Sequence, residues 1–154
     1  MKLYIDGDAL PNLLKPIILR AIERLDIVSY IISNKKINIG KTPKSQLINY
    51  IIVEQGADEA DNHIVELVEK DDLVITADIP LADRVISKDA HAIDHRGELF
   101  TTENIKHLLA MRNLMQEIRD SGEMTKGPSA FSPKDVGNFA NNLNAFFQKY
   151  QNFI

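Results

Sequence analysis

The chain contains no cysteine, and this absence removes several classes of protein at once. Disulfide scaffolds, cysteine nucleophiles and thiolate zinc sites all need a thiol, so none of them is available to this sequence. A chain without thiols suits a reducing compartment. We therefore expect a cytoplasmic protein.

Long apolar runs and glycine-rich loops are also missing. The first apolar run, Leu3-Tyr4-Ile5, ends at Asp6, and no stretch approaches the roughly 18 apolar residues that a membrane span needs. The seven glycines are scattered, and no GxGxxG or Walker-type loop occurs. The sequence therefore predicts no membrane partner and gives little support to a nucleotide-binding fold.

Positive charge is not in excess either. Lys and Arg number 18 against 22 Asp and Glu, which gives a net charge of -4. This balance argues against a protein that coats nucleic acid by bulk electrostatics, so any such contact would have to be local. The length of 154 residues is that of one domain with its own core. We therefore expect a single domain over residues 1–154.

Apolar periodicity divides the chain into alternating elements. The expected strands cover residues 2–5, 27–32, 47–53, 72–77 and 91–93, and the expected helices cover 11–25, 58–70, 79–87, 101–119 and 132–150. Strand and helix alternate over the first two-thirds, and helices finish the chain. This order favours an α/β fold in which a parallel sheet is covered on both faces, with a helical extension over about 123–154.

The last expected helix carries a stripe of apolar side chains and opens with a capping box at Ser132 and Asp135. The stripe consists of Val136, Phe139, Ala140, Leu143, Phe146, Phe147 and Tyr150. We expect the stripe to pack in the core. Any exposed remainder could serve a partner or a second copy, so the sequence leaves a homo-oligomer open.

Aspartates stand where the apolar runs stop. Asp6 and Asp8 follow the first run, Asp78 follows Leu73–Ala77, and Asp58 and Asp61 open the helix after the third strand. In a parallel sheet these carboxylates would gather at one edge, where α/β proteins usually bind ligands. Crowded carboxylates repel one another, and hard cations such as Mg²⁺ or Mn²⁺ need several oxygen ligands. The set therefore predicts a divalent-metal site.

Helix capping is the simpler explanation for some of these residues. Asp8, Asp58 and Asp78 each precede an expected helix, where aspartate is a favoured N-cap. Capping leaves Asp6 unexplained, although Asp61 could form a reciprocal box with Asp58.

A metal site made of histidines has less support than the aspartate site, because His91 and His95 span a strand and a turn rather than one helix face.

Several segments together resemble one protein family. They are Ile5–Pro11, Gly56–Asn62, Leu73–Ala82, Arg96-Gly97-Glu98, Thr102–Ile105, Gly127-Pro128 and Phe139-Ala140-Asn141. In order and spacing they resemble the bacterial YaiI/YqxD family, also called UPF0178 or DUF188, along nearly the whole chain. The resemblance implies a PIN-like three-layer sandwich with additional C-terminal helices. It places the PIN-like acidic set on Asp6, on Asp58 or Asp61, and on Asp78, with Asp8 added by the family's Asp-x-Asp-Ala motif.

Many PIN-like domains are metal-dependent ribonucleases, so the first hypothesis is a phosphodiesterase acting on RNA or single-stranded nucleic acid. Asp6, Asp8 and Asp78 would hold the cation, and Asp58 or Asp61 would complete the site. Four lysines before the third strand, Lys35, Lys36, Lys41 and Lys44, could contact phosphates, although a solvated loop explains them more simply.

Two other functions remain open at the level of sequence. A non-catalytic metal-binding or interaction module would use the acidic cluster only for stability or regulation. A phosphomonoesterase of the haloacid-dehalogenase type would form an aspartyl-phosphate at Asp6, because Asp6-Gly7-Asp8 also fits its nucleophile and acid pair. The sequence does not decide between catalysis and binding, and it leaves substrate, metal and pathway open.

Overall fold

The computed structural model describes residues 1–56, 58–123 and 130–150. The strands are β1 (Leu3–Asp6), β2 (Ser29–Ser33), β3 (Ile48–Ile52), β4 (Leu73–Ile75), β5 (His91–Ile93) and β6 (Leu99–Phe100). The helices are α1 (Lys15–Leu25), α2 (Glu59–Leu67), α3 (Ile79–Ile86), α4 (Ile105–Asp120) and α5 (Pro133–Tyr150), with short 3-10 turns η1 (Asn12–Leu14) and η2 (Ser45–Leu47). Gly127-Pro128 and Ala57, which contribute to the family resemblance, lie outside the described residues.

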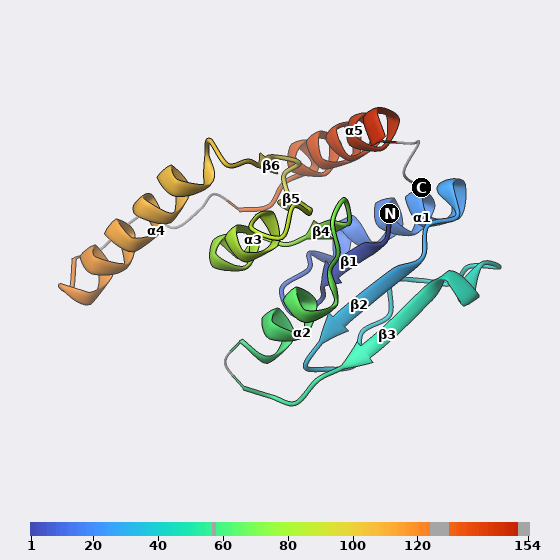
Figure 1. The fold of residues 1–154 in the computed structure, drawn as a ribbon, viewed down its shortest axis with the longest axis horizontal. Coiled ribbons are helices and arrows are strands. Elements are labelled where there is room, and N and C mark those ends of the chain that lie inside the picture. The colour runs from blue at the N-terminus through green and yellow to red at the C-terminus, as the bar shows by residue number, and fades with distance from the viewer. Residues whose placement is uncertain (57, 124–129, 151–154) are drawn as a thin grey trace.

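The strands form a single sheet in the order β3-β2-β1-β4-β5-β6 (Figure 1). The first five run parallel, and β6 pairs antiparallel with β5. The expected α/β fold with a mostly parallel sheet is therefore confirmed. The apolar pattern did not predict β6, because its two residues are too short to show a period.

The chain changes direction across the sheet at β1. After β1 it builds β2 and β3 on one side, and it then returns to add β4 on the other side of β1. Leu3 aligns with Ser29 of β2 and also with Leu73 of β4. At such a switch point the connections leave neighbouring strand ends in opposite directions, which opens a crevice at the carboxyl ends of the strands.

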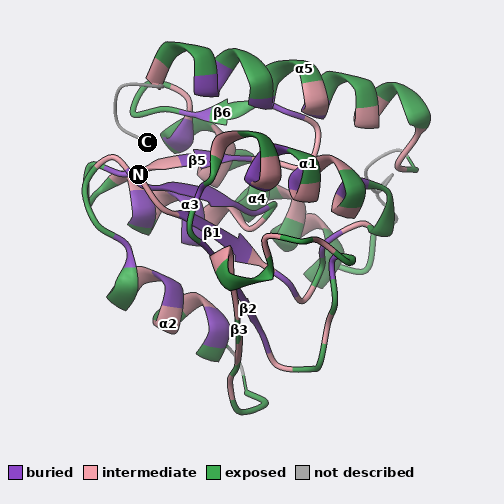
Figure 2. Ribbon diagram, turned by 90° about the vertical axis from the view of Figure 1, so that its right-hand side faces the viewer, coloured by how far each residue is buried: buried purple, intermediate pink, exposed green. Residues whose placement is uncertain are grey.

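Two hydrophobic clusters, one on each face of the sheet, make this a three-layer fold. In β1, Leu3 and Ile5 contribute to the cluster that includes α1 and α5, while Tyr4 contributes to the cluster that includes α2 and α3. This alternation follows from the two-residue period of a strand. Figure 2 shows the buried strands between α5 on one side and α2 on the other.

Helix α5 is part of one of these layers. Phe139 and Leu143 are fully buried, and Phe146 and Phe147 are nearly so, which confirms the core position expected for these four residues of the stripe. The other three, Val136, Ala140 and Tyr150, are half-buried. The predicted capping box is also present, since Asp135 Oδ2 accepts from the Ser132 N–H at 2.9 Å and the Asp135 N–H donates to Ser132 Oγ at 3.3 Å.

Helix α4 is different, because it extends away from the body of the fold (Figure 1). Its only buried residue is Ile105. The helix begins at Ile105 rather than at the expected residue 101, and Thr101 and Asn104 bond reciprocally ahead of it. Among the described helices, none combines the length and the apolar character that crossing a membrane requires.

Candidate functional site

The five aspartates predicted from the sequence line one pocket of about 410 Å³ at the carboxyl ends of β1 and β4. Its lining residues are Asp6, Asp8, Ala9, Gly56, Asp58, Glu59, Ala60, Asp61, Ala77 and Asp78. The carboxylates reach the pocket from three parts of the chain that the switch in strand order brings together. We refer to it as the acidic pocket.

Asp6 ends β1 and is partly buried. Because side chains alternate along a strand, it points to the same face as Tyr4, toward α2 and α3. Burial is the main cause that raises the pKa of Asp6, and the charges of Asp8 and Asp78 act in the same direction. Hydrogen bonds from Thr76 and from the Asp8 backbone oppose this shift without cancelling it.

Thr76 connects the Asp6 carboxylate to the backbone of Asp78 and was not among the residues predicted from the sequence. Its side chain is fully buried directly after β4. The hydroxyl donates to Asp6 Oδ2 at 3.0 Å and accepts from the Asp78 N–H at 3.0 Å. The Thr-Ala-Asp spacing, in which a threonine oxygen can bond the backbone two residues on, is the signal that could have identified it.

Asp78 is the one aspartate of the pocket that caps a helix through its side chain. Its Oδ1 accepts from the Leu81 N–H at 3.0 Å, at the start of α3. Asp58 precedes α2 with a left-handed backbone (φ 65°) and makes no capping bond from its side chain. Capping therefore explains only part of the acidic set.

Asp8 joins the pocket to the loop after β2. Its Oδ1 accepts from the Asn34 N–H at 2.7 Å. This bond fixes the carboxylate at the edge of the sheet where β2 ends. The capping role considered for Asp8 is not observed, because the helical segment that follows begins after Pro11.

Asp61, in the first turn of α2, is the aspartate of the acidic pocket whose pKa departs furthest from its ordinary value. Burial raises the pKa of Asp61 to about 7, and the charges of Asp78 and Asp6 contribute next. A hydrogen bond between the side chains of Asp61 and Asp78 adds to the effect, because protonated Asp61 can donate to the Asp78 carboxylate. Near neutral pH, Asp61 can therefore gain or lose a proton.

The donor chemistry of the acidic pocket fits a hard divalent cation. All of its candidate ligands are carboxylates, which Mg²⁺ and Mn²⁺ prefer, and their mutual repulsion is what a cation would relieve. Within the part of the chain that the structure describes, however, no three His, Cys, Asp or Glu side chains are arranged to hold a metal ion. Backbone and hydroxyl donors orient several of these carboxylates instead.

The four lysines considered for phosphate contacts occupy different places. Lys35 and Lys36 are exposed and directly follow β2, next to the Asn34 that bonds Asp8. Lys44 lies near the end of α1 instead, where its Nζ donates to Glu23 O at 2.6 Å and to Asp26 Oδ1 at 2.7 Å. Lys41 is exposed on the segment between them. The structure thus brings Lys35 and Lys36, but not Lys44, to the acidic edge.

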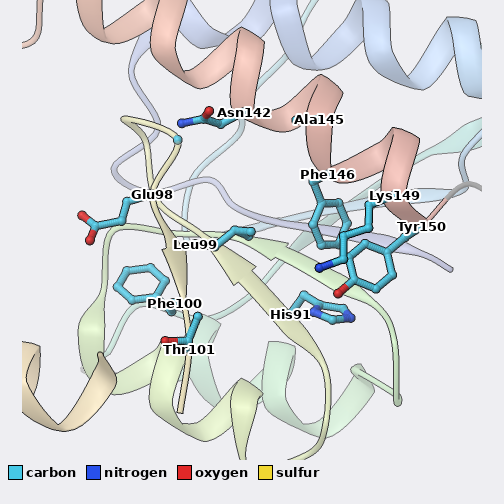
Figure 3. A pocket seen from close by; sticks show the side chains of 11 residues that line it. His91, Glu98, Leu99, Phe100, Thr101, Asn142, Ala145, Phe146, Lys149 and Tyr150 are labelled. Carbon is cyan, nitrogen blue, oxygen red and sulfur yellow. The ribbon is translucent and has the colours of Figure 1, made fainter. Parts of the chain in front are cut away.

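A second pocket, of about 520 Å³, lies between β5, β6 and α5 (Figure 3). It has an aromatic wall, in which the rings of Phe146 and Tyr150 lie 5.2 and 4.6 Å from the ring of His91. Burial lowers the pKa of His91, which favours the neutral imidazole. Among the described residues that line this pocket, Glu98 is the only carboxylate, so they form no acidic cluster.

Comparisons with known proteins agree with the resemblance seen in the sequence. The family profile DUF188, described as "Uncharacterized BCR, YaiI/YqxD family", matches residues 4–149. A UPF0178 protein of Sulfurimonas denitrificans is 69% identical over 149 residues, with 97% of each chain covered. A UPF0178 protein of Sulfurovum sp. is also 69% identical, with 97% of this chain and 99% of the relative covered. A third UPF0178 protein, from Nitratiruptor sp., is 60% identical over 151 residues.

Proposed function

The chain belongs to the YaiI/YqxD family of UPF0178 proteins, and from its acidic pocket we propose that it is a divalent-metal-dependent phosphodiesterase acting on RNA or single-stranded nucleic acid. The proposal rests on one observation. Asp6, Asp61 and Asp78 converge at the switch point of the sheet, where burial first and then the charges of Asp78 and Asp6 raise the pKa of Asp61 to about 7. A PIN-like nuclease would use such a set.

Each residue of the acidic pocket has a role in this proposal. Asp6, Asp8 and Asp78 would hold Mg²⁺ or Mn²⁺, and Asp58 or Asp61 would complete the site. A bound cation supplies an activated water and stabilises charge on the scissile phosphate. Thr76 orients Asp6 through its hydroxyl. With a pKa near neutrality, Asp61 could hold or release a proton during the reaction.

The shape and charge of the surroundings support a nucleic-acid substrate bound by local contacts. The acidic pocket opens at the edge of the sheet, where Lys35 and Lys36 follow β2. These lysines would contact phosphates beside the scissile bond, while the net charge of -4 argues against a general electrostatic attraction. A chain without cysteine suits the cytoplasm, which we propose as its compartment.

Cleavage assays with matched variants test the proposal. Purified protein is incubated with single-stranded RNA, single-stranded DNA and a phosphomonoester, with Mg²⁺ or Mn²⁺, beside Asp6→Asn and Asp78→Asn. Asparagine keeps a hydrogen-bond acceptor at both positions and can still cap α3 at position 78. Asp89→Asn removes a carboxylate outside the acidic pocket, at a left-handed residue (φ 61°), and serves as the control.

We expect metal-dependent cleavage that both pocket variants abolish and the control retains. Metal binding without turnover on any substrate would instead support the non-catalytic module. Release of phosphate from the monoester, with a phosphoenzyme trapped at Asp6, would support the haloacid-dehalogenase-type reaction. Either result would overturn the proposed nuclease.

A further inference from the structure

In the described part of the chain, strand β3 forms one edge of the sheet, and its sequence lacks the charges and prolines that usually protect an edge strand. No charged residue and no proline occurs from Leu47 to Val53. Tyr50 is 42% exposed and Ile52 is 60% exposed. Natural proteins normally protect edge strands with charges, prolines, bulges or a covering element, because an open edge can pair with another strand.

The backbone of β3 has polar groups directed away from the sheet. The Val53 N–H donates to Ser33 O at 2.9 Å, so residues at alternate positions along β3 bond to β2. Tyr50 and Ile52 fall between these positions and point their N–H and C=O groups outward. At the opposite edge, by contrast, Leu99 O of β6 accepts from Asn104 Nδ2 at 2.9 Å.

We propose that β3 pairs antiparallel with β3 of a second copy of this chain, about a two-fold axis at Tyr50. In this register each Tyr50 N–H donates to the Tyr50 carbonyl of the other copy. Each Ile52 N–H donates to the Ile48 carbonyl of the other copy. The Ile48 N–H is not available for this pairing, because it already donates to Ser45 O. The two sheets join into one.

Side chains and charges favour a second copy in this orientation. Ile48 of one copy faces Ile52 of the other, and the two Tyr50 rings face each other, which are favourable cross-strand pairs. The chain before β3 carries the exposed Lys41, and the exposed Glu54 follows it, whereas Lys44 is already paired with Asp26. Antiparallel pairing sets the acidic end of one strand against the basic end of the other, whereas parallel pairing would bring like charges together.

The pairing leaves both acidic pockets open and does not depend on the proposed function. The acidic pocket lies at β1 and β4, which β2 separates from the β3 edge. Because the two sheets run in opposite directions, the pockets of the two copies would open toward opposite ends of the dimer. Five residues of strand pairing make a small interface compared with the usual total of about 1,600 Å², so we expect association that depends on concentration.

Cysteine crosslinking tests the register, because the native chain has no cysteine. Facing residues of a hydrogen-bonded antiparallel pair lie about 5.5 Å apart at Cα, within the range of a disulfide. Under mild oxidation Tyr50→Cys should form a covalent dimer. Ile52→Cys is the matched control, since residue 52 faces residue 48 of the other copy and should stay uncrosslinked.

A second measurement avoids any loss of the Tyr50 side chain, whose hydroxyl accepts from the Ile39 N–H. Light scattering across a concentration series should show dimers for the native chain and monomers for Ile52→Lys. Leu13→Lys, at another exposed apolar residue (54%), should still form dimers. Native protein that stays monomeric, or equal crosslinking of both cysteine variants, would overturn the proposal. If the native chain is a monomer, the β3 edge would be open for pairing with a strand of another protein.

Discussion

The ionisation of Asp61 makes the folded state depend on pH. Its pKa is raised from 3.8 to about 7, so between these values the folded chain holds a proton that the unfolded chain has lost. The stability that this proton confers is fully present below the unfolded pKa of 3.8. It is lost as the pH rises through about 7.

We predict that Asp61→Asn stabilises the protein at pH 8 and leaves it nearly unchanged at pH 4. The amide introduced at position 61 stays neutral at both values and can still donate to Asp78. After allowance for solvent screening of a partly exposed group, the gain at pH 8 should be about 1–2 kcal/mol. Urea unfolding at the two pH values measures it, and an equal effect at both would contradict the prediction.

Thr76 holds Asp6 and the backbone of Asp78 through a single hydroxyl. Thr76→Val keeps the shape of the side chain but leaves the Asp78 N–H without this acceptor and Asp6 without this donor. We predict a loss of about 1–3 kcal/mol in the free energy of unfolding. Thr76→Ser keeps the hydroxyl and should recover most of it. A valine variant as stable as the native chain would show that these bonds contribute little.

Among the elements, α5 contributes most to the core of the described C-terminal part. The side chain of Phe139 is fully buried and packs in the cluster around β1 and α1. We predict that Phe139→Ala destabilises the protein by about 3–5 kcal/mol. Asn141→Ala, on the exposed side of the same helix, should change stability by less than about 0.5 kcal/mol. Similar thermal unfolding of the two variants would mean that α5 is dispensable.

The order of the elements could be predicted because parallel strands buried on both faces appear as short apolar runs. Their ends were less certain, since Asp6 belongs to β1 by its pairing with Ile32 although its side chain is charged. The helix expected from residue 11 begins at Lys15, because the 3-10 turn Asn12–Leu14 precedes it, and Pro16 lies in its first turn, where the missing N–H has no cost.

The position of the acidic pocket was also predictable, because carboxyl ends of parallel strands meet at one edge. The sequence did not show which aspartate caps a helix and which only lines the pocket, because that depends on the direction of each side chain. Asp78 caps α3, whereas Asp58 adopts a left-handed backbone and does not cap α2 through its side chain. Thr76 was missed because its bond to the Asp6 carboxylate joins residues that are 70 positions apart in the sequence.

For the whole molecule, cation binding should raise thermal stability. A ligand at about 100 times its dissociation constant adds about 2.7 kcal/mol, which for a chain of this size corresponds to roughly 5–10 °C in Tm. We predict a rise of this order with saturating Mg²⁺ or Mn²⁺ at pH 8. The combined Asp6→Asn and Asp78→Asn variant should show none. An unchanged Tm in the native protein would argue against a metal in the acidic pocket.

The pairing of β1 with β4 also has a consequence for the order of events during synthesis. Leu3 aligns with Leu73, so the two strands that flank the acidic pocket are separated by most of the first half of the chain. Contacts of such long sequence separation form late, because a large loop must close first. A nascent chain that has completed β3 carries Asp6 and Asp8 but not yet Thr76 or Asp78. Whatever the acidic pocket does, it cannot begin before β4 leaves the ribosome.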